Sequence, residues 1–315
     1  MAGTYNIFVF VLTYLLVSRF DGVMSMVSIC PTYCTCTNNL LNCENGYTVN
    51  SRWFNTLPKN FSNIRFHNFV LRELTAQHFQ WFEQLNTITI TDSRMRSLDE
   101  YSFAKLPLLT TIDLQNNHLS EIPSHTFANQ RNLTSLSLSH NIIERLPEQL
   151  FTNTTRLHTL RISHNRIRLL PSKLFDGLTN LVHLDLSHNE ISYILPRTFS
   201  FISVVRYIDL SDNLLVTLHE DLFDSNNITV DTKLSVVANP LDCNCGLIWL
   251  QEAIKGKFNH LEMLNASDIV CANPRIYVGQ KLSDVPLEHL NCTRPTANVR
   301  DASDNLYHGN KVGNH

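Results

Sequence analysis

Residues 109–132 of the chain read LTTIDLQNNHLSEIPSHTFANQRN, and the stretches that follow repeat the same pattern. They are 133–156 (LTSLSLSHNIIERLPEQLFTNTTR), 157–180 (LHTLRISHNRIRLLPSKLFDGLTN) and 181–204 (LVHLDLSHNEISYILPRTFSFISV), and a further copy opens at Val205. Each step is 24 residues long. A fixed period of this length indicates a repeat architecture, in which each unit stacks on the next.

Two columns of side chains keep one register through the copies. Apolar residues stand at places 1, 4, 6, 11 and 14 of each copy, an Asn at place 9 and a Phe at place 19. The Phe column consists of Phe79, Phe103, Phe127, Phe151, Phe175, Phe199 and Phe223. The Asn column consists of Asn117, Asn141, Asn165, Asn189 and Asn213, followed by Asn239 after a longer step of 26 residues. Agreement between two independent columns is hard to obtain by chance.

Each column has a physical role. Alternating apolar residues at places 4 and 6 predict a short strand with one buried face, because successive side chains on a strand point to opposite sides. An Asn at the end of the strand can hydrogen-bond the backbone of the adjoining turn and tolerate its bent geometry. Stacked Asn side chains then form a ladder for backbone groups that the bend would leave unpaired. The Phe fills the core opposite the strands. No unit buries its own apolar face, so the units must stack into a curved solenoid.

The pattern L-x-x-L-x-L-x-x-N, followed by a second apolar half and a Phe, resembles the leucine-rich repeat in its 24-residue extracellular form. The resemblance implies an α/β fold: a right-handed, horseshoe-shaped solenoid with a parallel sheet on its concave side and irregular or short helical turns outside. Seven full repeats and a closing partial repeat are expected over residues 61–239. Eight stacked strands would span roughly 35 Å, which is enough for a protein ligand.

The eight cysteines form two groups of four at the ends of the array. They are Cys30, Cys34, Cys36 and Cys43, then Cys243, Cys245, Cys271 and Cys292. The terminal faces of a stacked array expose core and need caps, and an even number of cysteines at each end of an exported chain favours disulfides. Spacing alone leaves three pairings open within each group. Zinc is the weaker alternative, because it requires a reducing compartment.

Both cysteine groups resemble the caps of secreted leucine-rich-repeat proteins. The spacing C-x3-C-x-C-x6-C followed by Leu57-Pro58 resembles the N-terminal cap, here residues 26–60. Residues 240–292, which contain CNCGLIWLQEAI, resemble the C-terminal cap, and apolar residues at helical spacing predict a short amphipathic helix there. The resemblance implies the bonds Cys30–Cys36, Cys34–Cys43, Cys243–Cys271 and Cys245–Cys292.

The N-terminus is expected to direct export. Residues 7–17, IFVFVLTYLLV, form an apolar run that is too short to span a bilayer and suits the core of a signal peptide. Small residues before the bond after Ser25 predict a signal peptide over residues 1–25; a retained signal anchor is the alternative. We therefore expect a secreted, extracellular protein with no membrane span. The polar tail, 293–315, is expected to be disordered, and a truncated longer receptor is the alternative.

Six N-x-S/T sequons predict N-linked glycans. They begin at Asn60, Asn132, Asn153, Asn227, Asn265 and Asn291. None lies within the face of an L-x-L strand, so sugar at these sites would leave the concave sheet open. Chance sequons in an Asn-rich chain are the alternative, and Asn291 is the weakest candidate because its middle residue is Cys292.

The first two repeats, which begin at Phe61 and Leu85, break the Asn column. They carry Phe69 and Ser93 where the Asn belongs. A Ser can make a weaker bond to the backbone, and a Phe cannot. We therefore expect the ladder to begin at Asn117 and these two repeats to be the first to open.

The concave sheet presents the variable positions of each strand, which are polar and mostly small at its centre. The expected ligand-binding patch consists of Arg161, His183, Asp185, Tyr207 and Asp209. Tyr207 ranks above its neighbours, because Tyr is enriched at interface hot spots. A solvated strand face, with binding elsewhere, is the alternative.

His140, His164 and His188 occupy one place in three consecutive repeats. At normal strand spacing they would lie about 5 Å apart, and a metal-binding or pH-sensing column is one interpretation. The sequence SHN is also a common variant of this turn in leucine-rich repeats. We therefore expect surface residues and no metal site.

No catalytic motif appears: the chain has neither a G-x-S-x-G turn nor a phosphate-binding glycine loop. We expect no enzyme activity and no cofactor. A net charge of −3 gives no electrostatic footprint for nucleic acid. The resemblance implies an extracellular protein-binding module, of the kind found in Slit, the Trk receptors and Toll-like receptors, that acts in recognition, adhesion or signalling on an extracellular or cell-surface protein. The alternatives are innate-immune recognition of microbial ligands and a non-catalytic, stabilising subunit of an extracellular enzyme.

Overall fold

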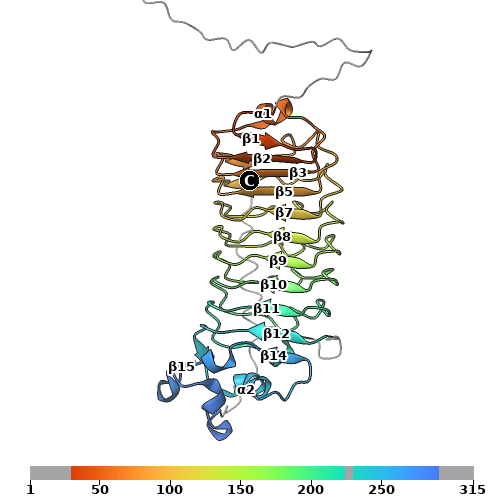
Figure 1. The fold of residues 1–315 in the computed structure, drawn as a ribbon. Helices are drawn as coiled ribbons and strands as arrows, with labels where there is room; N and C mark the ends of the chain where they lie inside the picture. Colours follow the sequence, from red (N-terminus) through yellow and green to blue (C-terminus); the bar gives the residue numbers. More distant parts are fainter. Residues whose placement is uncertain (1–29, 224–229, 291–315) are drawn as a thin grey trace, which may run out of the picture.

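The computed structural model describes residues 30–223 and 230–290, which form a solenoid of stacked turns (Figure 1). Successive turns contribute strands to an 11-stranded sheet. In spatial order the strands are β1 (Cys34–Cys36), β2 (Leu40–Glu44), β3 (Asn63–His67), β5 (Thr87–Thr91), β7 (Thr111–Asp113), β8 (Ser135–Ser137), β9 (Thr159–Arg161), β10 (His183–Asp185), β11 (Tyr207–Asp209), β12 (Thr232–Ser235) and β14 (Leu261–Met263). From β2 onward all neighbours pair in parallel, which confirms the expected leucine-rich-repeat solenoid with its concave parallel sheet.

The eight strands expected from the repeats are present in the large sheet, from β3 to β12, and both caps add further strands to it. At the N-terminal end β1 and β2 form an antiparallel hairpin, and β2 then pairs in parallel with β3. At the other end β14 continues the parallel ladder from β12. The caps therefore pair backbone groups that would otherwise stand open at the edges of the array. At normal strand spacing the sheet spans roughly 48 Å.

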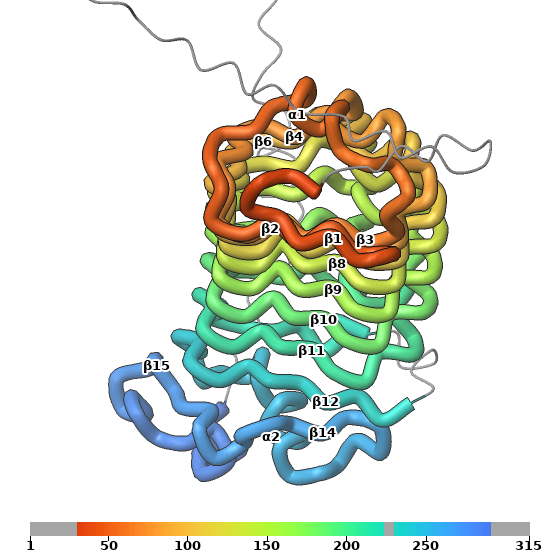
Figure 2. The backbone as a smooth tube through the Cα atoms, turned by 45° about the horizontal axis from the view of Figure 1, so that its top comes forward, coloured from red at the N-terminus to blue at the C-terminus, as the bar shows by residue number. Residues whose placement is uncertain are grey.

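Apolar side chains from every turn point inward and form one continuous core. On the strand side, Ile112, Leu136 and their counterparts are fully buried. On the opposite side, the ring centroids of Phe103 and Phe127 lie 6.0 Å apart and those of Phe127 and Phe151 lie 6.2 Å apart. Figure 2 shows the strands stacked along one side of the tube, with loops closing each turn around this core. Each turn thus buries its apolar side chains against its neighbours.

The ladder of Asn side chains forms, and Asn165 illustrates its geometry. The side-chain amide of Asn165 donates to the carbonyl oxygens of Leu138, Ile162 and Ser163 at 3.0, 3.1 and 3.1 Å. Its side-chain oxygen accepts a hydrogen bond from the backbone N–H of Ile143 at 3.0 Å. Because Leu138 and Ile143 belong to the preceding turn, each ladder Asn ties two turns together. Equivalent bonds are made by Asn117, Asn141, Asn189, Asn213 and Asn239.

The residue before each ladder position, and Asn45 at the matching place in the N-terminal cap, adopt a left-handed backbone conformation, with φ between 51° and 56°. These residues are Asn45, Asn68, Asp92, Asn116, His140, His164, His188, Asp212 and Ala238. Among residues other than Gly, Asn, Asp and His are the ones enriched in this region. The three His residues therefore fit a requirement of the turn itself.

The two irregular ladder positions, Phe69 and Ser93, are accommodated in different ways. Phe69 lies over Gly46, where an added Cβ would stand 2.1 Å from the Phe69 ring. The Phe69 ring also packs against Trp53, with the ring centroids 6.1 Å apart. Trp53 belongs to helix α1 (Ser51–Thr56), which the sequence pattern does not predict. The hydroxyl of Ser93 accepts a hydrogen bond from the Phe69 N–H at 3.4 Å, a longer form of the ladder bond.

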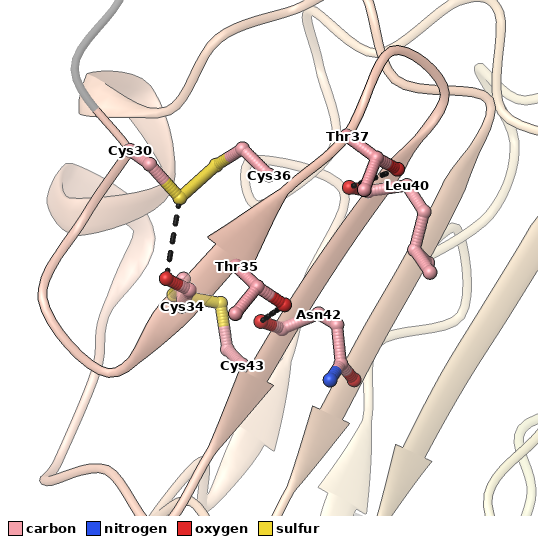
Figure 3. Close-up of a disulfide and its surroundings, with 8 residues drawn as sticks. All are labelled: Cys30, Cys34, Thr35, Cys36, Thr37, Leu40, Asn42 and Cys43. Atoms are coloured by element: carbon pink, nitrogen blue, oxygen red, sulfur yellow. Dashed lines mark hydrogen bonds between the residues drawn. A yellow bond between two sulfur atoms is a disulfide. The ribbon is translucent and has the colours of Figure 1, made fainter.

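Disulfides close both ends of the array. Among the described residues they are Cys30–Cys36, Cys34–Cys43 and Cys243–Cys271, the pairing that the resemblance implies. Figure 3 shows the first two beside the β1–β2 hairpin. The other expected bond, Cys245–Cys292, involves a residue outside the described part of the chain.

The predicted closing helix is present as α2 (Ile248–Ile254). The indole N–H of Trp249 donates to the carbonyl oxygen of Leu218 at 2.8 Å. The buried side-chain amide of Gln251 donates to the carbonyl oxygen of Leu282 at 2.7 Å. These bonds join the last repeat, the helix and the C-terminal segment.

The remaining strands and helices of the described residues are short. Two strand pairs lie outside the large sheet: β4 (Glu73–Leu74) with β6 (Ser97–Leu98), and β13 (Leu241–Asp242) with β15 (Cys271–Asn273). The 3-10 helices are η1 (Glu220–Leu222), η2 (Cys245–Leu247), η3 (Ala266–Asp268), η4 (Arg275–Tyr277), η5 (Leu282–Asp284) and η6 (Leu287–His289). No helix within 30–223 or 230–290 has the length and apolar character needed to cross a bilayer. The expected signal peptide and polar tail, 1–25 and 293–315, lie outside the described residues.

Candidate functional site

The five residues expected to bind ligand lie together on the concave face, by which we mean the side chains at places 3, 5 and 7 of strands β2 to β12. Strands β9, β10 and β11 are neighbours and pair in register. His183 lies opposite Tyr207, and Asp185 lies opposite both Asp209 and Arg161. Since neighbouring strands are about 5 Å apart, these side chains form one surface, which we call the β9–β11 patch.

Two aromatic rings are fixed in this patch. The rings of His183 and Tyr207 stack with centroids 4.6 Å apart and an interplanar angle of 5°. The Tyr207 hydroxyl donates to Asp209 Oδ2 at 2.8 Å. Burial, assisted by this hydrogen bond, raises the pKa of Tyr207 to about 12, so the phenol stays protonated at neutral pH. Burial and then the charge of Arg161 lower the pKa of His183, so its ring is neutral there.

The two carboxylates of the patch are held by their own turns. Asp185 Oδ1 accepts hydrogen bonds from the backbone N–H and hydroxyl of Ser187 at 3.1 and 2.7 Å. Asp209 Oδ1 accepts the same pair from Ser211 at 2.9 and 2.6 Å. The repeated D-x-S sequence could have revealed this clamp. It fixes the orientation of both carboxylates, so the patch presents two carboxylates and two ring edges in defined positions, next to the positive charge of Arg161.

Small hydroxyl residues line the middle of the concave face, between β5 and β9. They are Thr87, Thr89, Thr91, Thr111, Ser135, Ser137, Ser139, Thr159 and Ser163. The hydroxyls of Ser139 and Ser163 share a hydrogen bond of 3.0 Å. Among the described residues, the buried Ser137 hydroxyl has no partner. Burial raises the pKa of Asp113, which lies beside this region on β7. The middle of the face therefore presents mostly small, polar side chains.

The His column stacks at the edge of the sheet. The rings of His140, His164 and His188 lie 4.1 Å apart at each step, with interplanar angles of 12°. Parallel rings at this spacing do not aim their nitrogens at one point, and no group of three or more His, Cys, Asp or Glu in the described part of the chain is placed to hold a metal ion. Burial, followed by the charges of the two neighbouring His, lowers the pKa of His164. At the end of the stack His188 Nε2 lies 3.5 Å from Asp212 Oδ2.

The expected glycosylation sites that the structure describes lie outside the strands of the sheet. Within the described ranges they are Asn60, Asn132, Asn153 and Asn265, while Asn227 and Asn291 lie outside. Asn60, Asn153 and Asn265 are exposed. Asn132 is half-buried, and its side-chain amide donates to the carbonyl oxygen of Pro107 at 3.0 Å. Sugar at these positions would not stand on the concave face.

A hollow that sequence reasoning missed lies at the N-terminal end of the concave face. It has a volume of about 190 Å³ and is formed by β2, β3 and β5. Its lining consists of Leu40, Asn63, Ile64, Arg65, Thr87 and Thr89. The sequence signal was Arg65 at place 5, the place that Arg161 occupies in its own repeat. The hollow itself depends on the small side chains of the next strand, which the repeat pattern leaves free to vary.

Two family descriptions match the sequence. "Leucine rich repeat" matches residues 155–215, and "BspA type Leucine rich repeat region (6 copies)" matches residues 47–175. A search of curated protein sequences finds no significant match.

Solved structures align with a larger share of the chain than either family description does. Human 5T4 (Wnt-activated inhibitory factor 1, trophoblast glycoprotein) aligns with a TM-score of 0.64 and 21% identity, over 85% of this chain and 100% of its own. A chain of the octameric complex of Latrophilin 3, Unc5D and FLRT2 aligns with a TM-score of 0.59 and 19% identity, over 84% of this chain and 100% of its own. A chain of the LRIM1/APL1C complex aligns with a TM-score of 0.55 and 22% identity, over 73% of this chain and 45% of its own.

At these identities the likeness to solved structures establishes the fold alone. The family matches add the repeat sequence, over ranges that together run from residue 47 to residue 215. The described strands and disulfides add the architecture. The chain therefore carries leucine-rich repeats, folded as a parallel solenoid with disulfide bonds at its ends.

Proposed function

We propose that the protein is exported and binds an extracellular or cell-surface protein through its concave face, without carrying out a chemical reaction. A sheet of roughly 48 Å offers room for an interface of ordinary size. Structurally similar chains come from protein assemblies, namely the complex of Latrophilin 3, Unc5D and FLRT2 and the LRIM1/APL1C complex. A role in recognition, adhesion or signalling fits such a surface.

The observation that carries the proposal is the β9–β11 patch. Its rings stack, and its carboxylates are clamped by Ser187 and Ser211, so the side chains are already ordered before a partner arrives. Ordering a flexible side chain at an interface costs about 0.5–1.5 kcal/mol. A patch that is ordered in advance avoids much of this cost. Tyr207 is the proposed anchor, because it combines a half-buried ring with a polar edge.

Export and glycosylation belong to the same proposal. The disulfides at both ends favour an oxidising compartment, which agrees with a signal peptide over residues 1–25. The exposed sequons at Asn60, Asn153 and Asn265 are the proposed glycan sites with the best access. Mass spectrometry of secreted protein, before and after removal of N-glycans, tests both points. An intact N-terminus or unmodified sequons would contradict them.

The experiment that tests the function is a binding screen. The chain, tagged at its C-terminus and secreted from animal cells, is screened against a library of extracellular and cell-surface proteins. Each partner is then tested with Tyr207→Ala and with Asp209→Asn. We expect both changes to weaken binding by about 1–3 kcal/mol, the range of interface hot spots.

The matched control is Tyr101→Ala, which removes an exposed Tyr that lies away from the concave face. Thermal unfolding of all variants shows whether the fold is kept. Equal binding by the Tyr207 and Tyr101 variants would move the interface away from the β9–β11 patch. Failure to find any protein partner, together with binding to microbial glycans, would contradict the proposed function itself.

A further inference from the structure

The hollow at the N-terminal end of the concave face, which we call the Arg65 hollow, is lined mostly by residues that carry hydrogen-bond donors. It lies between β2, β3 and β5, at the red and orange end of the solenoid in Figure 1. Leu40 borders it on β2, while the side chain of Ile64 is buried in the core beneath it. The Arg65 guanidinium and the hydroxyls of Thr87 and Thr89 contribute the donors.

These donors are not used inside the protein. Arg65 is exposed, and it forms no ion pair or side-chain hydrogen bond with any described residue. The same holds for the hydroxyls of Thr87 and Thr89. Three residues whose side-chain donors have no partner among the described residues therefore line one hollow.

The nearest carboxylates are engaged elsewhere. Glu44 on β2 accepts a hydrogen bond from the side-chain amide of Asn42 at 3.0 Å. Asp92 lies 3.3 Å from Nδ1 of His67. Asp113, two strands away on β7, accepts a hydrogen bond from its own turn at 3.1 Å. None of them contacts Arg65 directly, although the charge of Arg65 acts on Asp113 at longer range and opposes the rise that burial causes in the pKa of Asp113. Arg65 itself is exposed.

We propose that the Arg65 hollow binds the carboxylate of an Asp or Glu side chain on the partner protein. The inference rests on the proposed function, because it names what the partner presents to this face. A guanidinium matches a carboxylate with two parallel hydrogen bonds, and the two hydroxyls can complete the shell of donors. The volume of about 190 Å³ falls below the roughly 300–1,000 Å³ typical of small-molecule pockets, so the hollow suits a single side chain.

With this site, the concave face carries a positive charge near its N-terminal end and carboxylates towards its C-terminal end. Arg65 stands on β3, and the clamped carboxylates Asp185 and Asp209 stand on β10 and β11, five and six strands further along the sheet. Arg161 on β9 lies opposite Asp185, so the two carboxylates leave an excess of negative charge at that end. At normal strand spacing the two ends of this charge pattern are roughly 24–29 Å apart. A partner with an acidic side chain at one end of its docking surface and a basic one at the other is held in one orientation, since complementary charges set register and suppress the reverse pose.

Fluorescence anisotropy with defined peptides tests the site without a known partner. The probes are fluorescein-labelled Gly-Ser decapeptides that carry two Glu, two Gln or two Lys residues, titrated at low salt with the full secreted chain. We expect the Glu peptide to bind and the Gln and Lys peptides to bind at least about fivefold more weakly at this site. Arg65→Gln should weaken the Glu peptide by about fivefold or more, and Thr87→Val with Thr89→Val by about two- to threefold.

The matched control is Arg131→Gln, which removes an exposed Arg from a loop away from the concave face. Similar loss with Arg131→Gln and Arg65→Gln, or equal binding of the Glu and Gln peptides, would overturn the proposal. Unfolding midpoints of the variants confirm that each is folded. If the library screen yields a protein partner whose affinity does not change in Arg65→Gln, the Arg65 hollow does not contact that partner. The proposal for the hollow then fails, while the proposed function stands. If peptide binding depends on Arg65 but no protein partner exists, the proposed function fails separately.

Discussion

Removing the side chain of Asn165 should destabilise the array more than its small volume suggests. The side-chain oxygen of Asn165 is the acceptor for the Ile143 N–H, and its amide is one of two side-chain donors to the Leu138 carbonyl. Ile143 and Leu138 are fully buried, so water cannot replace the lost partners. A buried donor left unpaired costs roughly 1–3 kcal/mol, and weaker bonding of three carbonyls adds to this. We expect Asn165→Ala to lower the free energy of unfolding by about 2–4 kcal/mol.

Two further substitutions separate hydrogen bonding from size. Asn165→Asp keeps the shape but cannot donate, and it places a charge against buried carbonyls, so it should cost at least as much as Asn165→Ala. Asn165→Ser copies the natural arrangement at Ser93 and should recover part of the loss. Urea unfolding followed by circular dichroism measures the midpoint and slope for each variant. A loss below about 0.5 kcal/mol in Asn165→Ala, the range of ordinary surface changes, or full stability of Asn165→Asp, would refute the reasoning.

Other parts of the array make equally specific predictions. Gly177→Ala should cost roughly 1–3 kcal/mol, because φ is +87° and an added Cβ would stand 2.7 Å from the Thr152 carbonyl oxygen. Gly256→Ala, at φ +75° with nothing within 4 Å, isolates the backbone cost, and equal thermal shifts in the two variants would contradict the clash. Because folding lowers the pKa of His164, the unfolded chain binds the proton more readily, so this residue should reduce stability as pH falls below about 6.5. His164→Asn should flatten the pH dependence of the unfolding midpoint, and an unchanged slope would count against it. Hydrogen exchange should show the first two repeats opening before the turn around Leu160, since their ladder bonds are missing or long; equal protection would show that the cap compensates fully.

Much of the fold was predictable because each position in a turn meets the same position in the next turn. The Phe and Asn columns follow directly from this rule, as does the register of the strands. The strands β1, β2 and β14 escaped prediction, because CTC, LLNCE and LEM lie outside the repeat pattern. Besides backbone hydrogen bonds, the Cys34–Cys43 disulfide ties β1 to β2, and the Lys233–Glu262 ion pair ties β14 to β12. Helix α1 escaped because its buried Phe54 and its Trp53 are explained only by the open end that they cover.

The candidate site was predictable to the extent that it follows register. His183 and Tyr207 share one place in the repeat, and so do Asp185 and Asp209, so the sequence predicts that they are neighbours. The register of β10 and β11 places them side by side. The binding of each carboxylate by its own turn could have been inferred from the repeated D-x-S sequence. The stacking of the two rings depends on side-chain conformations, which the pattern does not encode. The Arg65 hollow depends on Thr87 and Thr89 being small next to a long side chain on a neighbouring strand. Such a feature emerges only when three turns are placed together.

Within each turn, some positions maintain the fold and others are free to vary, and this separation indicates where a partner should bind. The ladder Asn and the left-handed residue before it satisfy the backbone, which leaves the concave places free to vary. Where those free places hold side chains already fixed by short contacts, as at Tyr207 and Asp209, binding loses little conformational freedom and gains affinity. Where they hold a long side chain without internal partners, as at Arg65, binding must order that chain and gains less. Arg65 should therefore act mainly through its charge, on the orientation and rate of docking, while the β9–β11 patch determines how long the partner stays.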